Sequence, residues 1–133
     1  EKRYLAIVSG RLDKTGVIDL PLDDKESRSE YRTLFSGRGV SILAVTPFTG
    51  RSHQIRRHLA AIRSPVMGDL RYGGKKLPGC EGHALHSWVI AFPDPVSGGK
   101  LKIMAPLQEA LAACLGRILG PEMPAFLDSF NEP

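Results

Sequence analysis

The apolar residues in the first half of the chain fall in short runs that turn-forming residues separate. Four of these runs have the length and the β-branched and aromatic content typical of strands. They cover residues 3–8, 16–22, 30–35 and 40–46. The last two runs are joined by Ser36-Gly37-Arg38-Gly39, a sequence typical of a tight hairpin turn. The pattern therefore predicts four strands, the last two paired as a hairpin.

The spacing of apolar residues changes after residue 50. Ile55, Leu59 and Ile62 recur at positions i, i+4 and i+7, which places them on one stripe of a helix. Ser52 is suited to cap the first turn of this helix. Pro65 ends it, because proline disfavours the helical conformation of the residue before it. We expect one short helix in the middle of the chain.

The second half of the chain predicts a hairpin and a further helix. The mostly apolar residues 84–92 and 101–105 read as two strands around a turn over residues 94–99. Pro106 suits the first position of a helix that runs to Leu119 and is followed by Gly120-Pro121. Residues 121–133 are expected to form a surface tail.

Together these elements predict an α+β fold. We expect a mixed, largely antiparallel sheet, a central basic helix and a C-terminal helix. A length of 133 residues suits one compact domain. The expected organisation is one folded unit over residues 1–120 followed by the tail.

Charge is distributed unevenly along the chain. The net charge is +4, but residues 31–68 contain six arginines, no lysine and no acidic residue. This segment carries +6, so the other residues together sum to −2. A cationic surface of this density favours a polyanionic partner, with nucleic acid first among the candidates. A solvated basic face without a partner is the alternative.

Cysteine content and hydropathy bear on the compartment. Two cysteines, Cys80 and Cys114, cannot make a disulfide framework, and this favours a reducing compartment and a cytoplasmic location. Cys114 falls on the apolar stripe of the last predicted helix, where we expect it to pack. No apolar run reaches the length of a membrane span. Neither a membrane nor an obligate protein partner is predicted.

Metal and phosphate sites are weakly supported. Cys80, His83 and His86 have a spacing that could hold a metal, but structural zinc usually needs a second ligand pair. No metal is therefore predicted. Gly68 and Gly73-Gly74 match no phosphate-binding pattern, so we interpret them as turns that need positive φ angles.

The helix over residues 52–63 carries the most chemistry. Arg56 lies at the border of its apolar stripe, where a guanidinium is costly unless it meets a buried anion. Four other side chains near the helix start are candidates to hold phosphates or base edges. They are Arg51, His53, Gln54 and Arg57. On spacing alone, Arg56 could equally form a structural salt bridge with no catalytic role.

The same stretch resembles a known family. Thr-Gly-Arg-Ser-His-Gln-Ile-Arg-Arg-His-Leu over residues 49–59, then Pro-Val-Met-Gly-Asp over 65–69, is similar to the RluA-like pseudouridine synthases. Residues 2–10, residues 16–22 and Leu85-His86-Ser87 resemble further family segments in the same order. The resemblance extends over residues 2–107, and the family modifies uridines in ribosomal and transfer RNA.

The resemblance assigns roles by position. It implies that Tyr4 contacts the flipped uracil, that Leu85 forms a wall of the uracil pocket, and that Arg56 pairs with a nucleophilic aspartate. That aspartate belongs to a His-Arg-Leu-Asp loop expected upstream of Glu1. Asp13, in an Arg-Leu-Asp sequence, follows Tyr4 and is no substitute. The chain then reads as the C-terminal part of a catalytic domain, inactive alone.

The family chemistry is physically consistent with an arginine at this position. A carboxylate in a closed pocket is desolvated, and an adjacent guanidinium keeps it ionised and oriented. Isomerisation of uridine to pseudouridine needs no redox partner, so no cofactor is implied. The expected partner is RNA, either ribosomal or transfer RNA. Two alternatives stay open: an RNA-binding module without catalysis, and a scaffold domain with a merely structural arginine.

Overall fold

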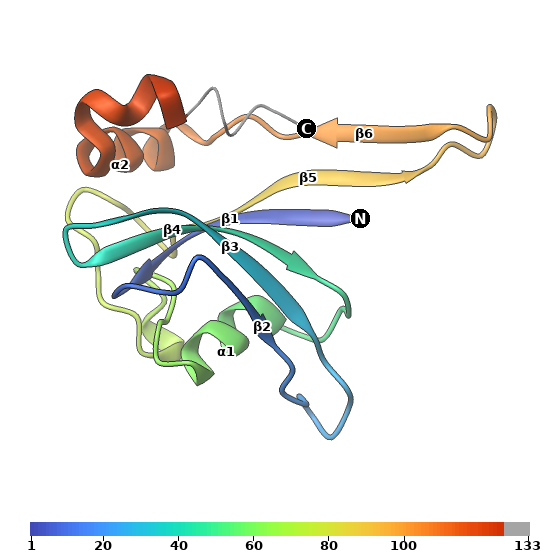
Figure 1. Ribbon diagram of the computed structural model, residues 1–133, viewed down its shortest axis with the longest axis horizontal. Helices are drawn as coiled ribbons and strands as arrows, with labels where there is room; N and C mark the ends of the chain where they lie inside the picture. Colours follow the sequence, from blue (N-terminus) through green and yellow to red (C-terminus); the bar gives the residue numbers. More distant parts are fainter. Residues whose placement is uncertain (127–133) are drawn as a thin grey trace.

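The computed structural model describes residues 1–126 and contains one six-stranded sheet with a helix on each face (Figure 1). The strand order is β2-β3-β4-β1-β5-β6, and each neighbouring pair is antiparallel. The α+β prediction is confirmed, and the sheet is antiparallel rather than mixed. The strands are β1 (Lys2–Ser9), β2 (Thr15–Ile18), β3 (Ser29–Gly37), β4 (Val40–Pro47), β5 (Leu85–Pro93) and β6 (Lys100–Met104).

Strand β1 lies in the middle of the sheet, between β4 and β5. Its consecutive residues Leu5, Ala6, Ile7 and Val8 are all fully buried. Successive side chains of a strand point to opposite faces, so both faces of the sheet are covered here. Helix α1 covers one of these faces and α2 the other (Figure 1). This explains why the strand reads as a continuous apolar run rather than as an alternating one.

The predicted hairpin between β3 and β4 is confirmed. Arg38 and Gly39 form its turn, with φ angles of 55° and 77°. Positive φ at both central residues is the geometry of a type I′ turn, whose twist matches that of the strands.

Strand β2 is shorter than the pattern predicted, since it ends at Ile18 rather than at residue 22. Pro21 lacks the N–H that a continuing strand would donate. Leu22 instead pairs locally with Lys25. The carbonyl of Leu20 is left free to accept a hydrogen bond from outside the sheet.

Helix α1 runs over Gln54–Ala61 and begins differently from the prediction. Ser52 is not its cap. His53 occupies that position in the left-handed conformation, with φ 50° and ψ 32°, and no side chain caps the helix. The helix ends as predicted before Pro65, with Arg63 also left-handed at φ 63°.

Helix α2 runs over Glu109–Leu119, three residues later than the predicted start at Pro106. A short 3₁₀ turn, η2 (Gly120–Glu122), follows it. Phe126 is buried in the hydrophobic core, so the expected surface tail is wrong at this position. Residues 127–133 of that expected tail lie outside the described residues.

Cys80 and Cys114 are joined as a disulfide, with their Cα atoms 5.9 Å apart. The expectation that Cys114 only packs is therefore wrong, although it is buried as predicted. The bond ties the loop before β5 to α2. Two of the three residues with metal-binding spacing have other partners. The disulfide occupies the sulfur of Cys80. The Nε2 atom of His86 lies 3.1 Å from the carbonyl oxygen of Ala105. Within residues 1–126, no group of three metal-binding side chains comes together.

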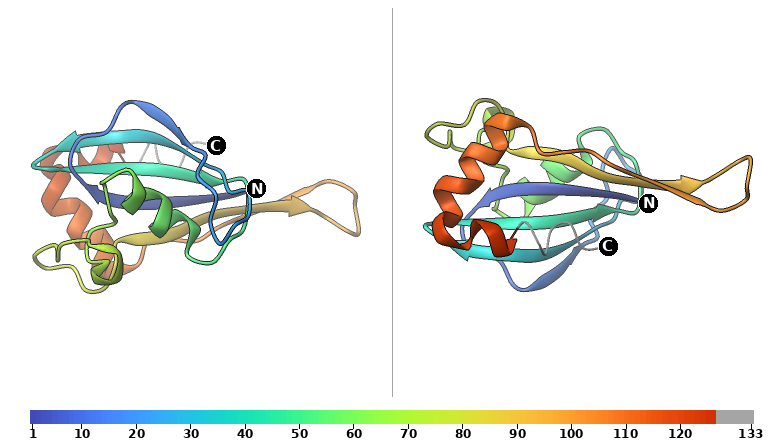
Figure 2. Two further views of the ribbon diagram at one scale, coloured as in Figure 1. Left: turned by 90° about the horizontal axis from the view of Figure 1, so that it is seen from below. Right: turned by 90° about the horizontal axis from the view of Figure 1, so that it is seen from above.

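Strands β5 and β6 form an arm that projects beyond the rest of the sheet (Figure 2). Ile90 pairs with Ile103, and Phe92 pairs with Leu101, so all four side chains share one face. Each of them is exposed. The arm therefore presents an uncovered apolar strip.

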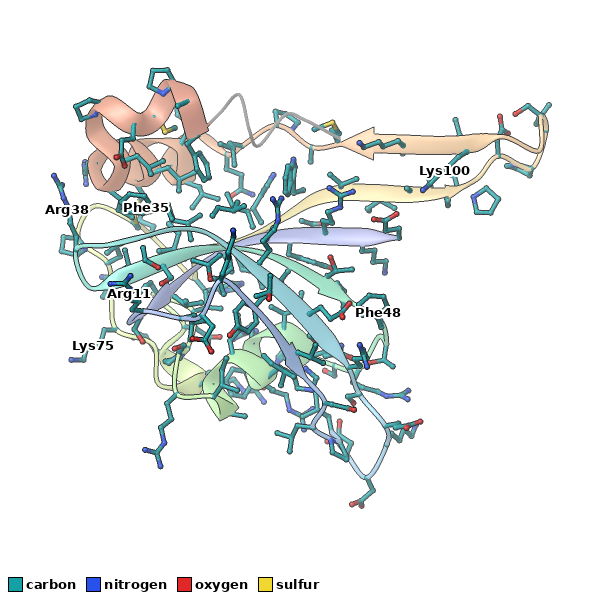
Figure 3. All side chains as sticks on the ribbon, viewed as in Figure 1. Arg11, Phe35, Arg38, Phe48, Lys75 and Lys100 are labelled. Atoms are coloured by element: carbon teal, nitrogen blue, oxygen red, sulfur yellow. A yellow bond between two sulfur atoms is a disulfide. The ribbon has the colours of Figure 1, made fainter. Side chains whose placement is uncertain are left out.

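The start of the chain lies along this arm. The backbone of Glu1 exchanges hydrogen bonds with that of Ala91, and its carboxylate pairs with Lys100 on the arm at 3.3 Å (Figure 3).

Among residues 1–126, no helix is long and apolar enough to cross a membrane.

Candidate active site

A cavity of about 370 Å³ opens between the start of α1 and the neighbouring face of the sheet. Its size lies in the range usual for small-molecule sites. Strands β1 and β5, the loop after β4 and the first turn of α1 all contribute to its wall. The lining residues are Lys2, Tyr4, Pro47, Thr49, Gly50, Arg51, His53, Gln54, Ile55, Arg56, His83 and Leu85.

Three residues that the family resemblance singled out meet in this cavity. Tyr4 lies on β1 and Leu85 on β5, and Leu85 pairs with Ala6, two residues beyond Tyr4. Residues two apart on a strand share a face, so Tyr4 and Leu85 face the same side. Arg56 reaches the cavity from α1. The fold thus brings together side chains that are up to 81 positions apart in the sequence.

Arg56 meets the buried anion that its position requires, and that anion is Asp69. The Nε atom donates to Oδ2 of Asp69 at 2.7 Å, and Nη2 donates to Oδ1 at 2.8 Å. The Asp69 side chain is 1% exposed and that of Arg56 is 16% exposed. This is the bidentate geometry in which a guanidinium and a carboxylate bind most strongly.

The ion pair shifts both groups toward their charged forms. Hydrogen bonding from Arg56 lowers the pKa of Asp69, although burial opposes this shift. The same hydrogen bonds raise the pKa of Arg56 above its usual value. Both groups therefore stay ionised at neutral pH.

Tyr72 connects this ion pair to His53. It belongs to the short 3₁₀ turn η1 (Leu70–Tyr72) that follows Asp69. Its ring centroid lies 5.0 Å from the guanidinium carbon of Arg56, and its hydroxyl shares a hydrogen bond of 2.9 Å with Nδ1 of His53. Desolvation, and then the positive charges of Arg56 and Arg71, lower the pKa of His53. These effects favour the neutral form of His53.

Arg51 lies on the cavity wall, and a backbone carbonyl group holds its side chain. Its Nε and Nη2 atoms both donate to the carbonyl oxygen of Glu26, at 2.9 and 2.8 Å. This contact fixes the side chain across the loop that precedes β3. Nη1 makes no hydrogen bond within residues 1–126.

Gln54 lies at the wall but is 4% exposed, and its amide is fully engaged. Its nitrogen donates to the carbonyl of Arg28 and to the hydroxyl of Ser29, while its oxygen accepts from Thr49 and from the backbone N–H of Arg51. An amide has two donors and two acceptor positions, so none is left for a ligand. Gln54 therefore supports the loop that forms the wall.

Ser29 extends this support into the core. Its hydroxyl lies 2.8 Å from Nδ1 of the fully buried His58, and Nε2 of His58 donates to the carbonyl of Leu20 at 2.9 Å. The chain of hydrogen bonds links Gln54 to the segment after β2, where the strand had ended early.

Arg57, a candidate phosphate contact in the sequence, does not line the cavity. Its Nη1 and Nη2 atoms donate to the exposed carboxylate of Asp23, at 2.9 and 3.0 Å. Of the four candidate RNA contacts, the structure brings Arg51 and His53 to the cavity with exposed polar groups. Gln54 and Arg57 are engaged elsewhere.

Several site features escaped the sequence analysis. Lys2, Thr49 and His83 line the cavity but carried no motif-based role. Phe48, exposed beside the wall residue Thr49, was also missed (Figure 3). Asp69 was part of a recognised motif without a role. A lone acidic residue just after an acid-free basic segment was the available signal.

Among residues 1–126, no acidic residue lines the wall, whereas Lys2, Arg51 and Arg56 bring positive charge to it. A phenol, an aliphatic side chain and cations around a cavity of this size suit a planar ring that carries an anionic group. The arrangement offers hydrogen bonding and charge stabilisation. It offers no carboxylate that could attack such a ring.

The site agrees with what the chain is similar to. The family model described as RNA pseudouridylate synthase matches residues 1–61. The ribosomal large subunit pseudouridine synthase D of Nitrosomonas europaea is 34% identical over 143 residues, covering 89% of this chain and 41% of the relative. The tRNA pseudouridine synthase C of Haemophilus ducreyi is 32% identical, covering 82% of this chain and 58% of the relative.

Solved structures give the same result for the fold. Human RNA Pseudouridylate Synthase Domain Containing 4 superposes with a TM-score of 0.74 at 21% identity, over 87% of this chain and 61% of that one. Human RNA Pseudouridylate Synthase Domain Containing 1 gives 0.66 at 25% identity, over 85% and 58%. The chain thus spans about half the length of the proteins it matches. In sequence and in fold, the chain is thus similar to RNA pseudouridine synthases over most of its length.

Proposed function

We propose that the intact protein containing this chain converts specific uridines of structured RNA, ribosomal or transfer, to pseudouridine. The observation that carries the proposal is the meeting of Tyr4, Leu85 and Arg56 in one cavity. Relatives named as synthases for ribosomal RNA and for transfer RNA support both substrate classes.

In this proposal, Tyr4 contacts the flipped uracil, Leu85 forms a wall of its pocket, and Arg56 pairs with a nucleophilic aspartate. None of the residues in 1–126 that line the cavity is acidic, and this is consistent with a nucleophilic aspartate that another part of the intact protein contributes. We expect it in a His-Arg-Leu-Asp loop upstream of Glu1. Without it, residues 1–133 are inactive.

The charges around the cavity support the physical side of the proposal. A base that leaves its stack costs a few kcal/mol, which contacts to the neighbouring phosphates can repay. Lys2, Arg51 and Arg56 supply positive charge at the wall for such contacts. Arg51 and His53 are the proposed RNA contacts there, whereas Arg57 could reach RNA only from outside the cavity. For Gln54, a direct contact would require breaking its present hydrogen bonds.

The proposed location is the cytoplasm. That prediction rested on the cysteine content, and the pairing of Cys80 with Cys114 takes this support away. Fractionation of the host cells, followed by detection of the intact protein in each fraction, would test this location.

The test uses the intact synthase and RNA labelled with tritium at C5 of uridine, because isomerisation releases that tritium to water. We expect release by the wild-type protein and at least a 100-fold loss for Arg56→Lys, since an ammonium cannot reproduce a fixed bidentate fork. Arg32→Lys, on exposed β3 away from the cavity, is the matched control and should retain activity.

Three results would contradict the proposal or a part of it. Wild-type protein that binds RNA but releases no tritium would indicate an RNA-binding module without catalysis. Full activity of Arg56→Lys would assign the arginine a merely structural role. Turnover by residues 1–133 alone would contradict the need for an upstream aspartate.

A further inference from the structure

A short segment behind the cavity wall holds two of the wall's side chains. Asp69 and Tyr72 do not line the cavity, yet Asp69 binds Arg56 and Tyr72 binds His53. Both belong to residues 66–75, which form a compact turn. We propose that Asp69 and Tyr72 are positioning residues of the synthase site, and that they fix how Arg56 and His53 face the substrate. This inference rests on the proposed function.

The turn itself is closely held. The N–H of Gly68 donates to the carbonyl of Lys75 at 2.7 Å, and that of Gly74 donates to the carbonyl of Asp69 at 2.7 Å. A Cβ atom at Gly68 would meet the carbonyl of Gly82, and one at Gly74 would meet that of Val66. Such close backbone approach leaves little freedom for Asp69. The turn is a rigid base for its carboxylate.

Asp69 determines which part of the Arg56 guanidinium remains available. It occupies Nε and Nη2, and two parallel hydrogen bonds fix the plane of the group. Within residues 1–126, Nη1 of Arg56 makes no hydrogen bond. Three N–H donors of Arg56, two on Nη1 and one on Nη2, therefore remain in a set direction for whatever anion enters the cavity.

Tyr72 contacts the face of the Arg56 guanidinium, whereas Asp69 binds its edge. Its ring lies against the Arg56 guanidinium, and Arg71 lies 5.5 Å from the same ring centroid. Cations near a ring face are attracted by its quadrupole. The Tyr72 hydroxyl also hydrogen-bonds to His53, the left-handed residue immediately before α1. One turn thereby sets the direction of two wall side chains from two sides.

A purely structural role for Asp69 predicts different behaviour from a positioning role. If Asp69 acts only through stability, both variants should keep kcat wherever they are folded, although Asp69→Asn loses the buried ion pair and Asp69→Glu overfills a buried site. If Arg56 must be held by a carboxylate, folded Asp69→Asn should lose kcat, and Asp69→Glu should retain more activity than Asp69→Asn. The kcat of folded protein therefore distinguishes the two roles.

The experiment measures kcat, KM and thermal stability for both variants in the intact synthase, at a temperature where each is folded. We expect Asp69→Asn to lose about 100-fold in kcat with little change in KM, the loss typical of a misdirected catalytic group. Asp69→Glu should recover part of kcat, because its carboxylate can still pair with Arg56. Leu115→Ala, in α2 on the other face of the sheet, is the destabilised control and should keep kcat.

Tyr72→Phe separates the hydroxyl from the ring. It removes the hydrogen bond to His53 and leaves the contact with Arg56, so we expect a smaller loss than for Asp69→Asn, in KM rather than kcat. Unchanged kcat for folded Asp69→Asn, or a kcat of folded Asp69→Glu below that of Asp69→Asn, would overturn the proposal for Asp69. Wild-type kinetics for Tyr72→Phe would overturn it for Tyr72.

A second measurement does not depend on catalysis. In residues 1–133, the Arg56 Nε–H should give a slowly exchanging NMR signal that exchanges faster in Asp69→Asn. Slow exchange that persists in Asp69→Asn would contradict the positioning role. If the intact wild-type protein fails to isomerise uridine, the proposed function fails, while this signal still decides whether Asp69 holds Arg56.

Discussion

Arg56 shows how far a single residue can be understood from its position. A guanidinium at the border of an apolar helix stripe has to meet an anion, and this requirement was readable in the sequence. Which anion it meets depends on where the chain turns after the helix. Asp69 is 13 residues further on and reaches Arg56 because the turn over residues 66–75 folds back beneath α1.

The Arg56–Asp69 pair predicts a specific acid sensitivity. Arg56 holds the native pKa of Asp69 below its ordinary value, so the stabilisation is fully present above the unfolded-state pKa of about 3.9. It is lost as the pH falls through the lowered native pKa. We expect wild-type residues 1–133 to exceed Asp69→Asn by about 2–3 kcal/mol in free energy of unfolding at neutral pH, because breaking a buried pair leaves Arg56 partly desolvated. Urea unfolding at several pH values measures this difference, which should narrow below about pH 4; a constant difference would contradict the assignment.

Two glycines give a matched pair of predictions with opposite signs. A Cβ at Gly74 would collide with the carbonyl of Val66, so Gly74→Ala should destabilise the chain by about 1–3 kcal/mol, the range typical of overpacking. Gly116 lies within α2 with open space around it. Gly116→Ala should stabilise by about 0.5–1 kcal/mol, because alanine is the better helix former. Thermal unfolding of both variants tests the signs, and a stable Gly74→Ala would show that the turn is looser than described.

At the level of elements, the apolar patterns predicted all six strands and both helices, with errors at their ends. Strand β2 stopped early at a proline, and α1 began after a left-handed His53 rather than after a Ser52 cap. The two errors have different causes. Pro21 cannot donate to a continuing strand after β2. At α1, tertiary contacts of the flanking loop, here the amide network of Gln54, compete with local capping preferences.

The disulfide between Cys80 and Cys114 links a loop to α2, a contact that no sequence pattern predicted. Closing a loop over a sequence separation of 34 residues should stabilise the oxidised chain by about 3–4 kcal/mol. We expect no reactive thiol in the unfolded, unreduced protein, two after reduction, and a lower melting temperature once reduced. Cys80→Ser should melt like the reduced wild-type chain. Two free thiols without reductant would contradict the pairing.

At the scale of the whole molecule, the projecting arm stands out from the core. Its apolar strip faces solvent, and β6 is at the edge of the sheet. An exposed, apolar edge strand favours association between chains, which charged residues suppress. This tendency to associate depends on where the arm lies in the fold, because the same apolar residues would be buried in the core if another element packed on them.

The strip predicts how residues 1–133 behave in solution. Ile103→Lys should change the free energy of unfolding by no more than about 0.5 kcal/mol, since the side chain is 55% exposed. It should also reduce self-association, measured by light scattering across a concentration series. Val96→Lys, in the exposed turn at the end of the arm, is the control for added charge alone. A strongly destabilised Ile103→Lys would mean that the strip is covered.

The sequence by itself determined the elements, the density of positive charge around α1 and the family, because periodicity, charge and motifs are local properties. Through the family it also named Tyr4, Leu85 and Arg56 before the cavity was known. Only the tertiary structure decided that Asp69 is the partner of Arg56, that Tyr72 holds His53, and that the amide of Gln54 hydrogen-bonds within the protein to hold the cavity wall. These contacts depend on chain reversals between distant segments, and the geometry of such reversals is set by packing rather than by local pattern.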